Sequence, residues 1–271
     1  MLTRFFFVIA SVLFAFSATA HEEPGSLVYV DANGYLHSNW HHRLSNVGFE
    51  VHDVVLYDNH LYWIETRDRG DGSWLVRADY DGSRAWNIRF TALDFRPHAL
   101  AFDGRYVYVS ANWETYRMPK DGGALQGLLR YGARAFDVRD GYIYWHEREG
   151  IFRRDASGVG NIKRLVYTND CREIEVRGRY VYWSEGTAVW RCSVDGGRSE
   201  RLYRTWSDIK SIAVSDRHIY IATWRDGVFT TDFNGHGRLG MWGGVRANKI
   251  AYNAGAQRPV RQQNVQWGHF R

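Results

Sequence analysis

The chain has 271 residues, of which 45% are hydrophobic and 16% aromatic, and its formal net charge is +5. This length and composition favour one folded domain, and because no apolar segment is long enough to cross a bilayer, no membrane span is predicted. The charge is mild, arginine-rich and spread along the chain, which argues against nucleic acid as the partner.

The first 20 residues have the pattern of a secretory signal peptide. Residues 1–4 include a positive charge, residues 5–16 are apolar, and residues 17–20 end in small side chains. The mature protein is therefore predicted to be secreted, either extracellular or, in a bacterium, periplasmic. Its first residue would be His21, whose amine and imidazole make a weak candidate for copper; a solvated terminus is the simpler interpretation, and no metal site is predicted.

Two short strands are predicted next, at Leu27–Val30 and Gly34–His37. They match the second and third strands of a repeat whose first strand is missing at this end of the chain. Asn248–Tyr252, near the other end, has the sequence of that missing strand. Because pairing would cover exposed sheet edges, the C-terminal strand is predicted to join the N-terminal segment.

Between these ends one pattern recurs, in which a Tyr-containing strand follows an apolar strand and precedes a third strand and a polar turn. The central tyrosines lie 36 to 46 positions apart, at Tyr62, Tyr108, Tyr144, Tyr182 and Tyr220. A repeat of this length with four short strands is typical of a propeller blade, because one small sheet cannot bury both faces alone. The sequence therefore predicts an all-β fold, a six-bladed β-propeller over residues 21–257, with its ring closed by the C-terminal strand.

The blade around Tyr182 gives the clearest boundaries. Its four strands are predicted at Arg172–Val176, Tyr180–Ser184, Ala188–Ser193 and Glu200–Tyr203. Cys171 precedes the first of these strands and Cys192 lies near the end of the third, with the second strand between them. Since a disulfide needs Cα atoms within roughly 7 Å, no disulfide is expected between the two cysteines.

The Tyr-Trp pairs of the second strands, and the strand-three arginine followed by Asp-Gly, resemble the YWTD repeats of the low-density lipoprotein receptor family. The arginines at that position are Arg77, Arg117, Arg153 and Arg191. The resemblance covers nearly the whole mature chain and implies a six-bladed fold. It also implies that these arginines, with Tyr62, Tyr144 and Tyr182, pack the blades together.

One position is polar in every predicted blade, two residues before the core aliphatic residue of the first strand. It is occupied by His52, His98, Arg134, Arg172, Lys210 and Asn248. These residues are predicted to surround one mouth of the central channel, where crowded positive charge favours an anionic ligand. The alternative is structural, with the cations paired to the nearby acids Asp53, Asp137, Glu173 and Glu175.

Arg69-Gly70-Asp71 lies in the longest loop between a second and a third strand. The tripeptide is similar to the cell-attachment sequence of many extracellular matrix proteins, and an exposed loop suits such a site. A chance match is the competing interpretation, because three residues are a short motif in a chain rich in arginine and glycine.

Residues 258–271 form a basic tail that contains Trp267 and Phe270. No Ser-His-Asp arrangement or carboxylate spacing identifies a catalytic centre, and no cofactor is predicted. The expected function is a monomeric, non-enzymatic binding module that recognises an extracellular protein or an acidic polysaccharide through one face. The alternative is an enzyme or cofactor-binding protein that uses the basic channel mouth; a deep pocket with acids or bases would favour it over a broad aromatic and arginine surface.

Overall fold

The computed structural model describes residues 26–38, 43–44, 49–57, 60–67, 72–79, 86–88, 97–111, 114–130, 132–237, 239–242 and 244–253. Every named element that these residues form is a β-strand, and the strands make six antiparallel sheets. No helix in this part of the chain is long and apolar enough to span a membrane. The predicted signal peptide at residues 1–20 and the tail at residues 258–271 lie outside the described residues.

The first sheet contains β2 (Leu36–Ser38), β1 (Ser26–Asp31) and β23 (Ala247–Asn253), in that order. The second contains β3 (Phe49–Tyr57), β4 (His60–Arg67), β5 (Ser73–Asp79) and β6 (Trp86–Ile88). The third contains β7 (Ala99–Phe102), β8 (Tyr106–Ser110), β9 (Thr115–Pro119) and β10 (Gln126–Leu129). The fourth contains β11 (Phe136–Arg139), β12 (Tyr142–Glu147), β13 (Gly150–Asp155) and β14 (Lys163–Tyr167).

The fifth sheet contains β15 (Glu173–Arg177), β16 (Tyr180–Glu185), β17 (Ala188–Ser193) and β18 (Glu200–Arg204), close to the four strands predicted around Tyr182. The sixth contains β19 (Ile209–Val214), β20 (His218–Thr223), β21 (Gly227–Asp232) and β22 (Leu239–Trp242).

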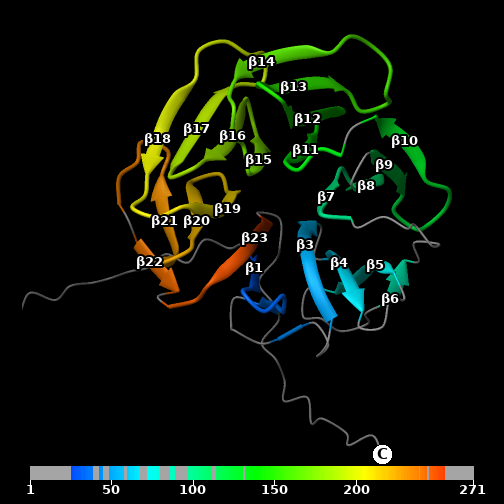
Figure 1. Ribbon diagram of the computed structural model, residues 1–271, viewed down its shortest axis with the longest axis horizontal. Coiled ribbons are helices and arrows are strands. Elements are labelled where there is room, and N and C mark those ends of the chain that lie inside the picture. The colour runs from blue at the N-terminus through cyan, green and yellow to red at the C-terminus, as the bar shows by residue number, and fades with distance from the viewer. Residues whose placement is uncertain are drawn as a thin grey trace, which may run out of the picture.

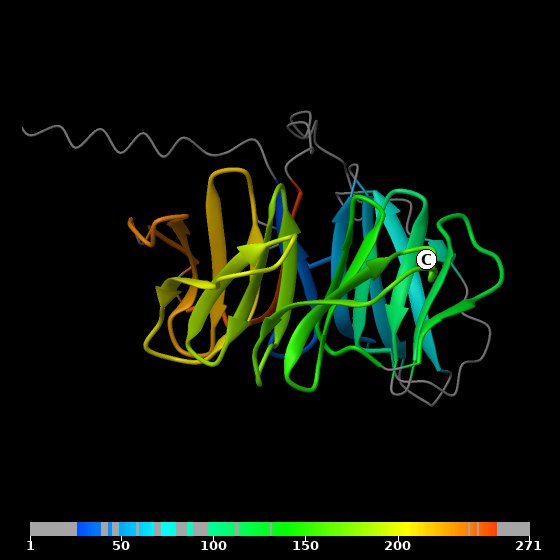
Figure 2. The ribbon, with the colours of Figure 1, turned by 90° about the horizontal axis from the view of Figure 1, so that it is seen from above.

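The six sheets surround a common centre (Figure 1). The strands nearest the centre are β3, β7, β11, β15, β19 and β23, and each of them contacts the next one around the centre. Seen from above, the molecule is a slab in which the sheets stand side by side and the strands cross its thickness (Figure 2). The first strand of each repeat therefore faces the axis, and later strands lie progressively farther out.

The predicted pairing of the two chain ends is confirmed. Antiparallel pairing of β1 with β23 sets Tyr29 opposite Ile250 and Val28 opposite Ala251. Tyr29 and Ile250 are buried, each with 4% of its surface exposed. The N-terminal sheet thus takes its inner strand from the C-terminal part of the chain.

The apolar core lies between neighbouring sheets. Trp145 of β12 packs in one cluster with Tyr108 of the preceding sheet, whereas its neighbour Tyr144 packs in another cluster with Trp183 of the following sheet. Adjacent residues of a strand point to opposite faces, so a Tyr-Trp pair supplies one large aromatic to each side. This explains why the pair recurs in the second strand, where both faces of a sheet are covered.

The strand-three arginines also join neighbouring sheets. Nη1 of Arg117 donates a 2.7 Å hydrogen bond to the Ala156 carbonyl, and Nη1 of Arg153 donates a 2.8 Å bond to the Val194 carbonyl. Both acceptors belong to the following sheet, and Asp195 of the turn there lies 3.3 Å from Nη1 of Arg153. These contacts agree with the packing role that the repeat resemblance implied.

Candidate functional site

The six polar positions predicted for the channel mouth all lie at the beginning of an inner strand. His52, Lys210 and Asn248 are in β3, β19 and β23, whereas His98, Arg134 and Arg172 come just before β7, β11 and β15. Each of the six positions is thus in or just before an inner strand. Whether they form one anion site stays a prediction.

Several of these side chains contact residues of their own neighbourhood. His52 Nε2 lies 2.7 Å from Thr66 Oγ1, and Asn248 Nδ2 donates a 3.3 Å hydrogen bond to the Asp31 carbonyl. Arg172 forms ion pairs with Asp208, at 3.5 Å, and with Asp170, at 4.0 Å. The arginine is 39% exposed, so solvent screens both pairs.

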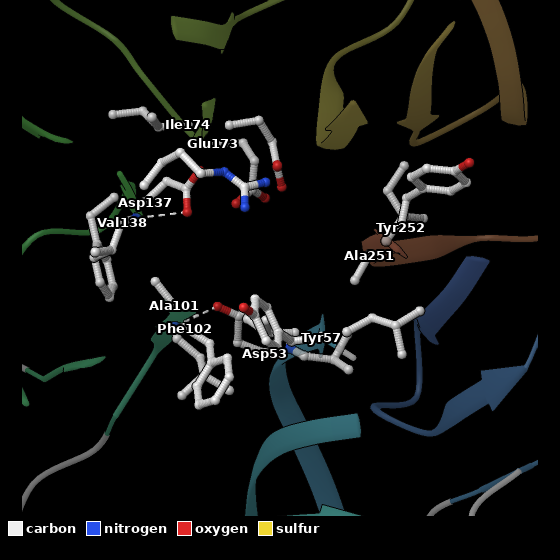
Figure 3. A pocket seen from close by; sticks show the side chains of 18 residues that line it. Asp53, Tyr57, Ala101, Phe102, Asp137, Val138, Glu173, Ile174, Ala251 and Tyr252 are labelled. Carbon is white, nitrogen blue, oxygen red and sulfur yellow. Dashed lines mark hydrogen bonds between the residues drawn. The ribbon is translucent and has the colours of Figure 1, made fainter. Parts of the chain in front are cut away.

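The acids proposed as structural partners of this ring lie in the inner strands β3, β11 and β15. Asp53, Asp137, Glu173 and Glu175 line a central cavity of about 90 Å³. Figure 3 shows the labelled acids Asp53, Asp137 and Glu173 pointing towards this space. Whether the cations of the ring pair with these acids stays a prediction; His52 lies at a β-bulge, where the register of the ladder shifts between Val51 and Asp53.

Lys249 of β23 is the counter-ion of two of these acids, Glu173 and Asp53. Its Nζ lies 2.9 and 3.1 Å from the two carboxylate oxygens of Glu173 in β15, and 3.5 Å from Asp53 Oδ1 in β3. Burial opposes the lysine charge, but the carboxylates of Asp53 and Glu173 outweigh it and raise the pKa of Lys249. One side chain therefore ties three inner strands together at the centre of the molecule.

Two of the carboxylates also bind backbone amides of the next sheet. Asp53 Oδ2 accepts a 2.7 Å hydrogen bond from the Leu100 amide, and Asp137 Oδ2 accepts one of the same length from the Val176 amide. Burial nevertheless raises the pKa of Asp137, although Arg139 and the amides act in the opposite direction. Because Asp53 and Asp137 accept hydrogen bonds from backbone amides of the next sheet, a structural role is favoured for both acids.

Glu175 is the fourth acid that lines the cavity. Burial raises the pKa of its carboxyl well above the ordinary value, and the charges of Asp137 and Glu173 raise it further against the opposing effect of Arg139. Glu175 therefore keeps its proton to a higher pH than an ordinary glutamate does. Among the described residues, no group of three or more histidine, cysteine or acidic side chains has the arrangement of a metal site.

Two exposed tryptophans form a second candidate site, which the sequence analysis did not identify. Trp206 lies in the β18–β19 loop with 92% of its surface exposed, and Trp224 follows β20 with 48% exposed. The Trp224 amide donates a 3.2 Å hydrogen bond to the Asp208 carbonyl, and Ser207 Oγ donates a 3.4 Å bond to Asp226. The loop that contains Trp206 is therefore fastened beside the turn that contains Trp224.

Cations surround the second of these tryptophans. Lys210 Nζ lies 4.6 Å from the centre of the Trp224 ring, and the guanidinium of Arg246 lies 6.0 Å from it. Arg172 joins the same region through its ion pair with Asp208. Trp206, Trp224, Lys210, Arg246 and Arg172 are called the tryptophan patch below; two of its members belong to the predicted ring.

Other predicted sites are outside the described residues or inside the core. His21 and the tripeptide Arg69-Gly70-Asp71 lie outside the described residues. Cys171 and Cys192 are both buried and not bonded to each other, and they belong to one apolar cluster. Burial raises the pKa of both thiols, that of Cys192 to about 11.

No protein-family model and no curated protein matches the chain. Among solved structures, the chain is similar to one described as the nidogen/laminin complex, with a TM-score of 0.72, 14% identity, and coverage of 86% of this chain and 99% of that one. It is also similar to TolB from Acinetobacter baumannii (TM-score 0.63, 15% identity, 84% and 66% covered). A third similar structure is a putative TolB from Agrobacterium tumefaciens (0.62, 14%, 83% and 92%). These likenesses establish a β-propeller fold.

Proposed function

We propose that this protein is a secreted, monomeric, non-enzymatic β-propeller that binds an extracellular protein or an anionic extracellular polymer through one face. Six blades closed by the β1–β23 pair, of the YWTD type, account for the six sheets and for the inner strands that contact one another around the axis. The Tyr-Trp pairs that pack each sheet on its neighbours also support that blade type.

The tryptophan patch is the observation that supports binding most directly. Because the Trp206 side chain is 92% exposed, its burial contributes almost nothing to the stability of the fold. Exposed aromatic side chains near arginine are typical of the residues that dominate binding energy. Hydrogen bonds fasten the surrounding loops, so that little ordering is required when a partner binds. The similarity to a structure solved as a nidogen/laminin complex is consistent with a protein partner.

An array of matrix proteins and acidic glycans, probed with the mature protein, tests this proposal. We expect at least one specific partner whose binding is weakened about tenfold or more by Trp206→Ala, because an exposed anchor residue contributes to binding and not to folding. Binding that is unchanged in this variant for every partner on the array would remove the patch from the function.

The ring of His52, His98, Arg134, Arg172, Lys210 and Asn248 is part of the same proposal, as a site for small anions. The combined changes Arg134→Gln and Arg172→Gln should abolish sulfate binding measured by calorimetry. The melting temperature should stay unchanged, because Arg134 is exposed and the ion pairs of Arg172 are solvent-screened. Unchanged sulfate binding would exclude the ring as the anion site.

A second candidate function is a small-molecule or catalytic site in the central cavity, and Glu175 is the observation that favours it. A carboxyl group that holds its proton to an elevated pH suits general acid chemistry. A thermal-shift screen of small amines and hydroxy compounds would test this idea, with Glu175→Gln as the variant that must lose any response. A screen without hits specific to Glu175 would leave the binding module as the function.

A further inference from the structure

We infer that the tryptophan patch binds a linear anionic polysaccharide, by stacking sugar rings on the two indoles and pairing the acid groups of the sugar with Lys210 and Arg246. This inference rests on the proposed binding function and names its partner. The shared chemistry is a pyranose ring with a carboxylate or a sulfate. An acidic protein segment is a different partner and is an outcome of the test.

The indoles provide the surface for the sugar rings. Trp206 is 92% exposed, so both faces of its ring are open, and Trp224 is 48% exposed in the adjoining turn. The backbone hydrogen bond from Trp224 to Asp208 brings that turn against the β18–β19 loop, two residues after Trp206. Two neighbouring flat aromatic groups suit a chain of repeated rings, because successive rings can stack in the same way.

The loop that presents Trp206 is rigid. The Thr205 amide donates a 2.8 Å hydrogen bond to the Thr187 carbonyl, and Thr205 Oγ1 lies 2.6 Å from the Ser207 carbonyl within the loop. The Ile209 amide donates a 3.0 Å bond to the Gly186 carbonyl on the other side of the tryptophan. Because both ends of the loop are fastened to the β16–β17 turn, the indole is held out before a ligand arrives.

The charges of the patch select for an anionic sugar. Lys210 and Arg246 lie beside the Trp224 ring, and among the residues that the structure describes no carboxylate is within 4 Å of either cation. Arg172, by contrast, is already paired with Asp170 and Asp208. With respect to the described part of the chain, these two cations next to an exposed aromatic group are available to a carboxylate or sulfate of the ligand.

The size of the patch favours a polysaccharide over a globular protein. A stable protein interface covers about 800 Å² and 20 to 30 residues on each partner, centred on a dry apolar core. Among the residues whose burial the structure describes, the exposed large hydrophobic residues of this region are Trp206 and Trp224, and charged side chains surround them. A narrow polymer strand can use such a strip fully, whereas a globular partner would cover mostly hydrated charge.

Binding to four immobilised polymers tests the inference: polygalacturonate, dextran sulfate, neutral dextran and poly-L-glutamate. We expect the mature protein to bind polygalacturonate or dextran sulfate, and the stronger of the two identifies carboxylate or sulfate as the acid group. Binding should weaken as salt rises. Neutral dextran has sugar rings without charge, and poly-L-glutamate has charge without sugar rings. If either polymer binds as strongly as the anionic polysaccharides, the inference is overturned.

Variants locate the binding on the patch. Trp206→Ala and Trp224→Ala should each weaken binding about tenfold, and Lys210→Gln should weaken it and reduce its salt dependence. Tyr180→Ala is the matched control, because Tyr180 is also an exposed aromatic residue (41%) with an arginine, Arg191, 4.8 Å from its ring centre. Tyr180 begins β16, whereas Trp224 follows the end of the equivalent strand β20, so the two residues lie at opposite ends of their strands. Equal loss in Tyr180→Ala, or none in Trp206→Ala, would contradict the inference.

The test also separates this inference from the proposed function. A protein partner that requires Trp206, found together with no binding to any polysaccharide, would overturn the anionic polysaccharide and leave the binding module in place. Melting temperatures of all variants accompany the measurements. The Trp206→Ala protein should melt with the wild type because the side chain is almost fully exposed.

Discussion

At the scale of single residues, Lys249 is the most consequential side chain at the centre of the molecule. It is 17% exposed and neutralises Glu173 and Asp53, which are 13% and 9% exposed. Removing one partner of a buried ion pair leaves an uncompensated charge, and this costs more than the intact pair contributes. The stability of the closing strand β23 therefore depends on electrostatics as well as on apolar packing.

We predict that Lys249→Met lowers the free energy of unfolding by about 3–5 kcal/mol, measured by denaturant titration. The combined change Lys249→Met and Glu173→Gln should recover part of the loss, because it removes one of the two stranded carboxylates. Lys163→Met is the control, since Lys163 is exposed in β14. If Lys249→Met unfolds at the same denaturant concentration as Lys163→Met, the central ion bridge has no energetic role.

Glu175 makes the stability of the fold depend on pH in a defined direction. A carboxyl group whose pKa is raised in the folded state contributes stability below its unfolded pKa, near the ordinary value of 4.5, and that contribution is lost as pH rises through the folded pKa. Glu175→Gln mimics the protonated form at every pH. It should therefore melt several degrees above the wild type at pH 7.5 and together with it at pH 4.

Glu149→Gln is the matched control for this prediction, because Glu149 is an exposed glutamate outside the cavity. Its melting temperature should follow that of the wild type at both pH values. A Glu175→Gln protein that melts below the wild type at pH 7.5 would mean that the ionised carboxylate is stabilising, contrary to the direction of its pKa shift.

At the scale of strands and sheets, the sequence patterns predicted most of the observed structure. The spacing of the tyrosines, the Tyr-Trp pairs and the match between Asn248–Tyr252 and a missing first strand led to the six sheets and the β1–β23 pair. β17 has the predicted bounds, Ala188–Ser193. Such features are predictable because they depend on the local alternation of apolar and polar residues and on a repeat that recurs several times in the sequence.

The candidate sites were only partly predictable from the same patterns. That Glu173 of the fifth sheet meets Lys249 of the first, two sheets away, follows only from the arrangement of the sheets around the axis. One feature of the sequence indicates that Trp206 is exposed: it lies in a loop between two strands. Exposure cannot be read from composition in a chain with 12 tryptophans, since Trp63, Trp145 and Trp183 are buried in the core.

The order of strands in the fifth sheet leads to a prediction about its thiols. β16 lies between β15 and β17, so Cys171, just before β15, and Cys192, in β17, are separated by a strand. Mass spectrometry of unreduced protein should find no peptide pair joined through them. Both thiols are buried with raised pKa values, and they should react with a maleimide only after denaturation. A disulfide-linked pair would disprove the strand order.

At the scale of the whole molecule, the two chain ends complete one sheet, and this sheet stands between its neighbours around the axis. β23 contacts β19 on one side and β3 on the other, while it pairs with β1. It also supplies Lys249, which binds Glu173 of β15. A single strand near the end of the chain therefore takes part in hydrogen bonding, apolar packing and the central ion bridge at once.

Deleting residues 246–271 removes β23 and should destabilise the protein by several kcal/mol or make it aggregate. The deletion exposes the edge of β1, uncovers apolar residues such as Tyr29, and leaves Glu173 and Asp53 without their lysine. Thermal melting and light scattering measure the effect, and a chain that ends at residue 257 is the control, since it keeps β23 intact. If the shorter chain melts at the same temperature as the control, then β23 does not hold the ends together and the proposed closed ring of six blades is wrong. If the control melts with the full-length protein while the shorter chain precipitates, the loss belongs to the strand itself and not to the basic tail.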